Sequence, residues 1–432
     1  MKKILCVLSV LVSGLFFVSA HVHAEGEDTP INVWRFNFRD VFDTYVHITI
    51  YTTDTLTEDD LEPLYYEIYN TVWRVHDVST KYPNPYIHPL PGETRDERKD
   101  DVAVREARVS VREINDNPGV AHVVDSWLLE MIQLGIDVYN DPATNQRFNI
   151  AMGSLLEVWK DYTERCLEEN ICELPSAQTL AAADTLNDPN LIVIDATAST
   201  VTIPEGMMLD LGGLAKGYGA DRVGDILRDS PFVNSFLVDA GGSSIELHGN
   251  RPHVDDGLWR IGLTEPDAYG RILMPGGTTV GTSSGFKRFY RVPGDDTRYH
   301  HLIDPDTRFP AQHMQAVTVL AEDTRMVDLH KSIAFLMELD DSIAYINGLE
   351  GVEALWVDND GTVHLSDGFS SVYTLEYYDE DSTSLWIYAL GGLSALMILA
   401  VAGYYVASAF RHKNDEVDYA GTTSTSSPSD DT

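Results

Sequence analysis

The chain has 432 residues, of which 44% are hydrophobic and 10% aromatic, so it can bury a substantial core and is not of disordered composition. Its 30 Lys and Arg residues against 68 Asp and Glu residues give a formal net charge of −38. A surface this acidic repels phosphate backbones, which argues against a nucleic-acid-binding protein. Adaptation to high salt and an acidic face made for one basic partner both stay open as explanations. Binding of a charged nucleotide would require local cations or a divalent metal.

Residues 1–24 have the pattern of a secretory signal peptide. Lys2 and Lys3 form a positive start, and an apolar stretch follows up to about Ala20. Cleavage sites of the small-x-Ala kind end at Ala20 and at Ala24. An uncleaved anchor is the alternative to a cleaved signal.

Residues 31–376 are expected to form one exported body of mixed strands and helices. Residues 45–51 alternate like a half-buried strand, and 58–77 carry apolar residues at helical spacing. Residues 84–110 are Pro-rich and then charged, which predicts a surface loop. Further strands are expected at 191–194, 199–203, 236–238, 259–263, 278–282, 316–320 and 354–357, and further helices at 120–139, 215–228 and 327–339. This order is irregular, so the pattern favours an α+β fold over βαβ repetition.

Two cysteines lie in the predicted exported body, Cys166 and Cys172. In an oxidising compartment they are able to form a local disulfide. Two isolated thiols are the alternative.

A second apolar stretch, residues 385–410, contains no charge and is long enough to cross a bilayer core of about 30 Å. Arg411, His412 and Lys413 follow it directly, so the positive-inside rule places the short tail, residues 411–432, in the cytoplasm. The expected location is therefore the cell inner membrane, crossed once, with the body on the periplasmic side. A buried core helix is the alternative reading of 385–410. The tail is rich in Ser, Thr and Asp, which is typical of a disordered segment.

The most informative stretch is residues 210–218, with the sequence DLGGLAKGY. It places Asp210 and two glycines directly before a predicted amphipathic helix. Glycines let a ligand approach the backbone, and a helix start offers free N–H groups to an anion. Lys216 would be able to reach a phosphate or a ring edge. A tight structural turn explains the same glycines, and the spacing is neither a Walker A loop nor G-x-G-x-x-G.

Later segments add further candidates. A glycine pair at 240–243 (AGGS) follows a predicted strand, where α/β sheets hold ligands, although a plain strand-end turn is equally consistent. A small, hydroxyl-rich turn lies at 281–285 (GTSSG). About fifteen residues further on, His301 and Asp304 stand before a Pro-fixed turn. This pair suits a general base and its orienting partner, or equally a satisfied polar turn.

Asp328 and Ser332 lie four residues apart on a predicted helix and therefore share one face. Their oxygens suit a hard cation such as Mg²⁺, with backbone carbonyls and waters completing its shell. A solvated helix face is the plain alternative.

Taken together and in this order, these segments resemble the ApbE family, the FAD:protein FMN transferases, over roughly residues 36–375. The residues that carry the resemblance are FDT at 42–44, VSTKY at 78–82, FNI at 148–150 with Trp159 downstream, DLGGLAKGY at 210–218, AGG at 240–242, TSSG at 282–285, HLIDP at 301–305, and Asp328 with Ser332. The resemblance implies an α+β, T-fold-like flavin transferase body with FAD as substrate and Mg²⁺ as cofactor.

Carried over position by position, the resemblance also implies the site residues. The implied FAD contacts are Phe42, Ser79, Phe148, Asn149, Ile150, Asp210, Lys216, His301 and Leu302. The implied Mg²⁺ ligands are the backbone oxygen of Gly213 and the side chains of Asp328 and Ser332. His301, steadied by Asp304, is the candidate catalytic base.

Several positions depart from the family pattern. Phe42 and Asp43 replace Met-Gly, Ser243 replaces a frequent Asp, Arg308 stands where Gly is usual, and Lys331 lies between the two metal residues where a small residue is common. A lysine beside a bound metal would weaken its binding.

The implied reaction is Mg-dependent transfer of FMN from FAD to a Thr or Ser hydroxyl of a target protein, through a phosphoester, with release of AMP. The expected target is a flavoprotein subunit of a membrane respiratory or ion-pumping complex. One alternative is an Mg-dependent FAD pyrophosphatase that gives FMN and AMP. Another is a non-catalytic flavin-binding membrane protein, and a purely structural surface protein is disfavoured because all the ligand segments are present in order.

Overall fold

The structure is a computed structural model that describes residues 31–53, 55–82 and 108–378. The predicted signal peptide (1–24), membrane-crossing segment (385–410) and tail (411–432) lie outside these residues and stay predictions, as does most of the predicted loop at 84–110. Within the described ranges, no helix combines the length and the apolar character needed to span a bilayer.

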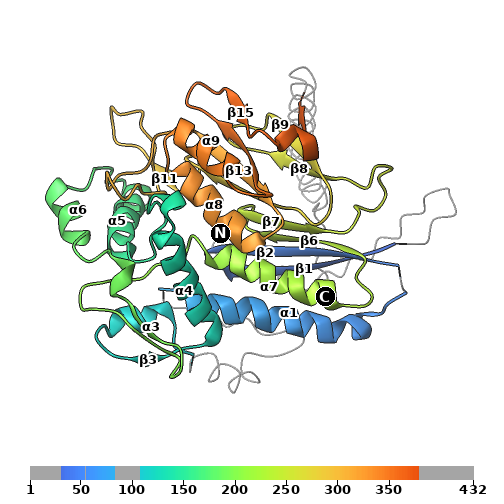
Figure 1. Ribbon diagram of the computed structural model, residues 1–432, viewed down its shortest axis with the longest axis horizontal. Coiled ribbons are helices and arrows are strands. Elements are labelled where there is room, and N and C mark those ends of the chain that lie inside the picture. Colours follow the sequence, from blue (N-terminus) through green and yellow to red (C-terminus); the bar gives the residue numbers. More distant parts are fainter. Residues whose placement is uncertain (1–30, 54, 83–107, 379–432) are drawn as a thin grey trace, which may run out of the picture. The chain divides into compact units, whose positions relative to one another are not determined.

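An eight-stranded sheet organises the fold (Figure 1). Every ladder between its neighbouring strands is antiparallel. In spatial order the strands are β1 (Asn32–Val41), β2 (Thr44–Thr52), β6 (Ser235–Ala240), β7 (Ser244–His248), β10 (Thr279–Ser284), β13 (Ala316–Ala321), β14 (Glu353–Val357) and β15 (Val363–Leu365). An antiparallel sheet with helices inserted irregularly along the chain confirms the predicted α+β class.

Three smaller sheets accompany the large one. Their strands are β3 (His122–Val123), β5 (Thr200–Thr202) and β4 (Val193–Asp195) in the first, β16 (Thr374–Tyr377), β9 (Gly270–Met274) and β8 (Trp259–Leu263) in the second, and β11 (Phe289–Tyr290) with β12 (Tyr299–His300) in the third.

The helices are α1 (Glu58–Ser79), α3 (Val111–Asp116), α4 (Ser126–Asn140), α5 (Gly153–Glu169), α6 (Ala177–Ala183), α7 (Ala215–Asp229), α8 (Thr324–Phe335), α9 (Leu339–Asn347) and α10 (Phe369–Val372), with short 3₁₀ turns at Pro142–Thr144 and Pro189–Leu191. Of these, α1, α7, α8 and α9 pack on one face of the large sheet, whereas Phe369 of α10 lies in the core on the opposite face, with β8 and β9. Helix α7 lies beside α1 and packs on β6 and β7, while α8 contacts α7 and packs on β10 and β13 (Figure 1). The N-terminal turn of α7 and the middle of α8 therefore lie close together over the central strands of the sheet.

The predicted helix at 58–77 is confirmed as α1, and its start has a local cause. Thr57 caps the helix: its hydroxyl accepts from the Asp60 backbone N–H, and the Asp60 carboxylate accepts from the Thr57 N–H in return. The predicted helix at 120–139 begins six residues later than expected. Asp125 caps α4 by accepting from the Trp127 N–H, and His122–Val123 before it pairs as strand β3.

The predicted helix at 327–339 corresponds to α8, which begins three residues earlier and ends four residues earlier than expected. Asp323 caps α8 through the N–H groups of Arg325 and Met326, so the helix begins at Thr324. It ends at Phe335, and α9 begins only at Leu339. The predicted helix at 215–228 is confirmed by α7, and the predicted strands are confirmed to within a few residues by β2, β4, β5, β6, β8, β10, β13 and β14.

Strand β13, near the centre of the large sheet, shows why the sequence there is a continuous apolar run. Val317 and Val319 face the core shared with the helices, whereas Ala316 and Leu320 face a second core under β8 and β9. Because side chains alternate across a strand, both faces of β13 are buried. Strand β10, which pairs with β13 and leads into the 281–285 turn, is therefore held by a strand that is buried on both faces.

Cys166 in α5 and Cys172 in the loop after it are joined by a disulfide, with their Cα atoms 4.3 Å apart. Of the two readings left open by the sequence, the paired one is confirmed.

Candidate functional site

The segment 210–218 forms the loop before α7 and the first turn of that helix. Asp210 is held from three directions: its backbone N–H donates to the carbonyl of Ile150 at 2.9 Å, its Oδ1 accepts from the Gly212 N–H at 2.7 Å, and its Oδ2 lies 2.8 Å from Lys81 Nζ. Burial alone would raise the pKa of Asp210, but Lys81 and the Gly212 hydrogen bond hold it below its ordinary value. Asp210 is therefore a charged, fixed acceptor.

The close approach of α7 and α8 depends on Gly217. A Cβ atom at this position would lie 2.6 Å from Asp328 Cβ and 2.9 Å from the Thr324 carbonyl oxygen, so no larger residue fits without moving a helix. The Gly217 N–H donates to Asp328 Oδ2 at 2.9 Å instead of to the Gly213 carbonyl four residues back. Asp328 thereby satisfies one of the free N–H groups at the start of α7.

Asp328 is the point at which three elements meet. It is 1% exposed, and besides the α7 backbone it accepts from the Ser244 hydroxyl of β7 at 3.0 Å and lies 2.7 Å from Lys331 Nζ, one turn further along α8. Burial alone would raise the pKa of Asp328, but the ammonium of Lys331 keeps it below its ordinary value. The carboxylate is charged and already has three donors.

These contacts test whether the predicted Mg²⁺ ligands fit a metal. Among the described residues, no three His, Cys, Asp or Glu side chains gather as a metal-binding group. The single carboxylate of the predicted set, Asp328, is ion-paired, and the Ser332 hydroxyl donates back to the Asp328 carbonyl at 3.0 Å. Like charges about 4 Å apart repel by about 4 kcal/mol per unit pair at an effective dielectric constant of about 20. With Lys331 in this position, the arrangement does not fit the divalent cation that the resemblance implies.

Two cations at the site have no carboxylate partner among the described residues. Lys216 Nζ donates to the Gly212 carbonyl at 2.8 Å, and Arg288 donates to the Asp43 carbonyl at 3.0 Å. Both act electrostatically on His301, so they lie near one another around its ring. In a chain of net charge −38 this is a local excess of positive charge. It is suited to an anion.

His301 lies on the exposed side of the segment after β12. Its Nδ1 contacts the carbonyl oxygen of Lys287 at 3.3 Å. Because a carbonyl only accepts, Nδ1 carries the hydrogen and Nε2 keeps its lone pair. The surrounding protein and the positive charges of Arg288 and Lys216 lower the pKa of His301, so the ring is neutral near pH 7.

Asp304 does not orient His301, which corrects the sequence-based pairing. Asp304 Oδ1 lies 2.8 Å from Arg147 Nη1 and accepts from the Asp306 N–H at 2.9 Å. Burial alone would raise the pKa of Asp304, but these bonds and His313, with Nε2 at 3.9 Å, keep it low. The turn at Pro305 directs the carboxylate toward a cavity of about 690 Å³, lined also by Glu338 and Tyr345, instead of toward the His301 ring.

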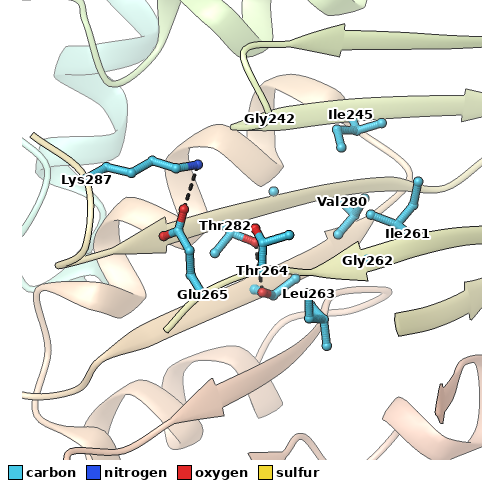
Figure 2. Close-up of a pocket in the computed structure, with 12 residues that line it drawn as sticks. Gly242, Ile245, Ile261, Gly262, Leu263, Thr264, Glu265, Val280, Thr282 and Lys287 are labelled. Atoms are coloured by element: carbon cyan, nitrogen blue, oxygen red, sulfur yellow. Dashed lines mark hydrogen bonds and ion pairs between the residues drawn. The ribbon is translucent and has the colours of Figure 1, made fainter. Parts of the chain in front are cut away.

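A much smaller pocket, of about 40 Å³, lies beside the glycine pair at 241–242 (Figure 2). Lys287 reaches across it, with Nζ 2.7 Å from Glu265 Oε1. Apolar side chains of β7, β8 and β10 form its floor: Ile245, Ile261 and Val280. The volume accommodates a water molecule or two and not a flavin ring.

The predicted FAD contact at Phe42 lies in the two-residue turn between β1 and β2. Both Phe42 and Asp43 have positive φ, of 54° and 56°, which costs roughly 1–2 kcal/mol for a residue with a side chain and explains why glycine suits this turn. The Phe42 ring packs over Gly219 of α7 and edge-on against His76 of α1. It forms a half-buried wall close to the start of α7.

Phe148, Asn149 and Ile150 form an irregular segment that supports the glycine loop, with the Ile150 carbonyl accepting from the Asp210 N–H. Phe148 is 7% exposed, and its ring would be 2.8 Å from a Cβ at Gly213. Asn149 uses its amide on the carbonyl of Asn187 and the N–H of Ala151. Ile150 is fully buried, so only its backbone can serve the site. These residues shape the loop from below.

Ser79 and Leu302 take part mainly through position. The Ser79 hydroxyl donates to the carbonyl of His76 at 3.4 Å, two residues before the lysine that pairs with Asp210. The Leu302 backbone bonds His300 and Ala311, which fixes the segment that presents His301. Whether either side chain contacts FAD stays a prediction.

The structure adds four polar residues that the sequence-based set lacks. Lys81 pairs with Asp210, Arg288 faces His301, and Ser243 and Ser244 bond Lys331 and Asp328. Lys81 and Ser243 stand inside motifs already recognised, so Lys81 could have been found as the charged residue of its motif and Ser243 as the polar residue after the glycine pair. Nothing in the sequence indicates Arg288, because it is brought in by the β10–β11 connection.

A sequence profile described as the ApbE family matches residues 94–356. Among curated proteins, the FAD:protein FMN transferase of Klebsiella pneumoniae (strain 342) is 29% identical over 277 residues, which cover 62% of this chain and 81% of that protein. The FAD:protein FMN transferase of Treponema pallidum (strain Nichols) is 30% identical over 237 residues, which cover 51% of this chain and 63% of that protein.

Solved structures share the fold. The ApbE protein of Thermotoga maritima has a TM-score of 0.62 at 24% identity, covering 78% of this chain and 99% of its own. The flavinyl transferase ApbE of Pseudomonas stutzeri, in its apo form, has a TM-score of 0.60 at 20% identity, covering 79% of this chain and 97% of its own. At these identities the likeness concerns the fold of the body.

Proposed function

Because the chain belongs to the ApbE family, we propose that it is a FAD:protein FMN transferase, the name carried by its relatives in K. pneumoniae and T. pallidum. The observation that carries the proposal is the meeting of the 210–218 glycine loop with Lys216 and Arg288, two cations without a carboxylate partner among the described residues. The pyrophosphate of FAD is an anion of the kind that such cations bind.

In the proposed reaction, a Thr or Ser hydroxyl oxygen of the target forms a bond to the FMN-side phosphorus of FAD. The phosphoanhydride bond breaks, and AMP leaves with its bridging oxygen and the electron pair of that bond. The hydroxyl proton passes to His301 Nε2, whose lone pair is free because Nδ1 bonds the Lys287 carbonyl. Lys216 and Arg288 stabilise the charge that builds on the phosphate oxygens. The product is a flavoprotein with FMN joined through a phosphoester.

Mg²⁺ is not carried over from the sequence-based prediction into this reaction. Lys331 Nζ lies 2.7 Å from the Asp328 carboxylate that would bind the metal. The proposed reaction therefore uses only side chains of the enzyme and the target hydroxyl.

We further propose that the body acts on the periplasmic side of the cell inner membrane, anchored by one span at 385–410, on a flavoprotein subunit of a membrane respiratory or ion-pumping complex. The apolar stretch followed by basic residues 411–413 supports the anchor, and the Cys166–Cys172 disulfide fits an oxidising compartment. A protease added to spheroplasts is expected to digest the body and to spare the 411–432 tail. Protection of the body would contradict this orientation.

The transferase proposal is tested with the full-length chain in detergent, FAD, and a candidate flavoprotein subunit that carries an accessible Thr. Mass spectrometry is expected to find one FMN added to the subunit, and liquid chromatography an equal amount of AMP. Free FMN and AMP without an adduct would replace the proposal by FAD hydrolysis. Unchanged, tightly bound FAD would replace it by flavin storage or electron transfer.

A further inference from the structure

Lys331 lies where a bound cation would be expected. Its side chain is 4% exposed, and its ammonium has three oxygen neighbours: Asp328 Oδ1 at 2.7 Å, the Ser243 carbonyl at 2.9 Å and the Ser243 hydroxyl at 2.5 Å. A carboxylate, a carbonyl and a hydroxyl are the donor types that hard metal ions prefer. In this protein the same three oxygens surround the side-chain nitrogen of Lys331 and not a metal ion.

The neighbouring strand makes room for this side chain. Lys331 is on α8, and its stem runs over Gly281 of β10, where a Cβ would lie 3.1 Å from Lys331 Cδ. The ammonium reaches the turn between β6 and β7 at Ser243. Three elements therefore hold Lys331 in one place. This differs from a surface lysine, which remains free to leave a carboxylate.

The formal charge of the site supports the same reading. Asp328 is the carboxylate of the predicted metal set, and Lys331 Nζ lies 2.7 Å from it. The other side chain that contacts Lys331, Ser243, is neutral, with its hydroxyl 2.5 Å from Nζ. The charges of Asp328 and Lys331 therefore cancel, and no net negative charge remains in this group to attract a divalent cation.

We propose that Lys331 is a resident cation that takes the place of a divalent metal, so that this chain neither binds Mg²⁺ at Asp328 nor needs it for FMN transfer. The transfer half of this statement rests on the proposed function. Lys331 acts as a positioning residue: it neutralises Asp328, which in turn holds the Gly217 N–H at the start of α7. The contacts to a phosphate are left to Lys216 and Arg288.

Calorimetric titration of the full-length protein in detergent with MgCl₂ and with MnCl₂ tests the binding half. Wild-type protein is expected to give no site-specific heat. Lys331→Ala is expected to gain one metal site, and adding Ser243→Asp to tighten it at least tenfold. Lys331→Met keeps the volume of the stem and substitutes for the alanine variant if the latter does not fold. Lys160→Ala, which removes a lysine on α5, is the matched control and gains no site.

The transfer half is measured with and without excess EDTA. Wild-type transfer is expected to change less than twofold, whereas any transfer by Lys331→Ala is expected to fall at least tenfold with EDTA. Stoichiometric Mg²⁺ binding by wild-type protein, or loss of its transfer in EDTA, would overturn the inference. Absence of transfer under every condition would count against the proposed function alone, since the titrations would still decide whether Lys331 excludes the metal.

Discussion

Replacing Lys81 by Met is expected to leave the carboxylate of Asp210 buried without its ion-pair partner. The side chains of Lys81 and Asp210 are 8% and 16% exposed, and their charged atoms are 2.8 Å apart. Removing one partner of such a pair costs about 3–5 kcal/mol, and partial exposure favours the lower end of that range. The second partner of Lys81, Glu157, is 43% exposed and remains solvated, so it adds little to the loss.

The stability lost in Lys81→Met is expected to depend on pH in a defined direction. In the wild-type protein the pKa of Asp210 is held below its ordinary value despite burial, so the pair stabilises the fold above the unfolded pKa, near 4, and loses this effect as pH falls through the folded pKa. Without Lys81, burial raises the pKa of Asp210, and stability falls as pH rises above about 4. The difference between Lys81→Met and wild type should therefore be largest near pH 7 and shrink toward pH 4.

Thermal unfolding of full-length protein in detergent, followed by tryptophan fluorescence, measures the effect. A loss of about 3 kcal/mol corresponds to a Tm roughly 6–12 °C lower, using the values for domains of 150–250 residues. Lys160→Met removes exposed ion pairs with Glu164 at 3.5 Å and Glu157 at 3.9 Å and a cation–π contact with Tyr82, and it is expected to change stability by about 1 kcal/mol or less. Equal losses in the two variants, a pH-independent loss, or no recovery in Lys81→Met with Asp210→Asn would refute the reasoning.

Three further predictions concern other parts of the body. His301→Gln is expected to lower the rate of FMN transfer about 10²- to 10⁴-fold at saturating FAD; a full transfer rate in a rapid-quench assay would remove it as the base. Asp304 raises the pKa of His313, as does Glu338 in spite of burial, so stability should fall as pH rises from about 6.5 through the higher folded pKa, and His313→Gln should abolish this slope in unfolding curves. Opening the disulfide by Cys166→Ala should cost about 2 kcal/mol for so short a loop, measured by thermal unfolding without reductant.

Periodicity and capping explain the parts of the fold that the sequence predicts well. Leu61, Leu64 and Ile68 recur at helical spacing, and all three are buried in α1. The sequence predicts too early a start for α4 because residues 120–125 are nearly as apolar as the helix that follows. Only the pairing of His122 with Val201, a contact between distant segments, makes that stretch a strand.

The sequence predicts which segments form the site, but it predicts few of the contacts that their side chains make there. The glycines before α7 and the Asp328 position follow from local pattern, and the structure brings both together through the Gly217 N–H. The direction of a side chain after a turn does not follow from spacing: Asp304 pairs with Arg147, which lies 157 residues earlier in the chain. Lys331 was visible as an unusual residue, but its three oxygen neighbours depend on how β6, β7 and α8 pack.

Whether Cys166 and Cys172 are joined in a given copy of the chain depends on how oxidising the compartment is in which that copy folded. Forming this bond removes two hydrogens and requires an oxidant, whereas the reducing systems of the cytosol keep such thiols reduced. Alkylation of a cell extract before any reduction would leave both cysteines unlabelled in exported copies and label both in copies retained inside. If the body is exported as proposed, this disulfide, whose cysteines are six positions apart, would distinguish exported copies of the chain from retained ones even after purification.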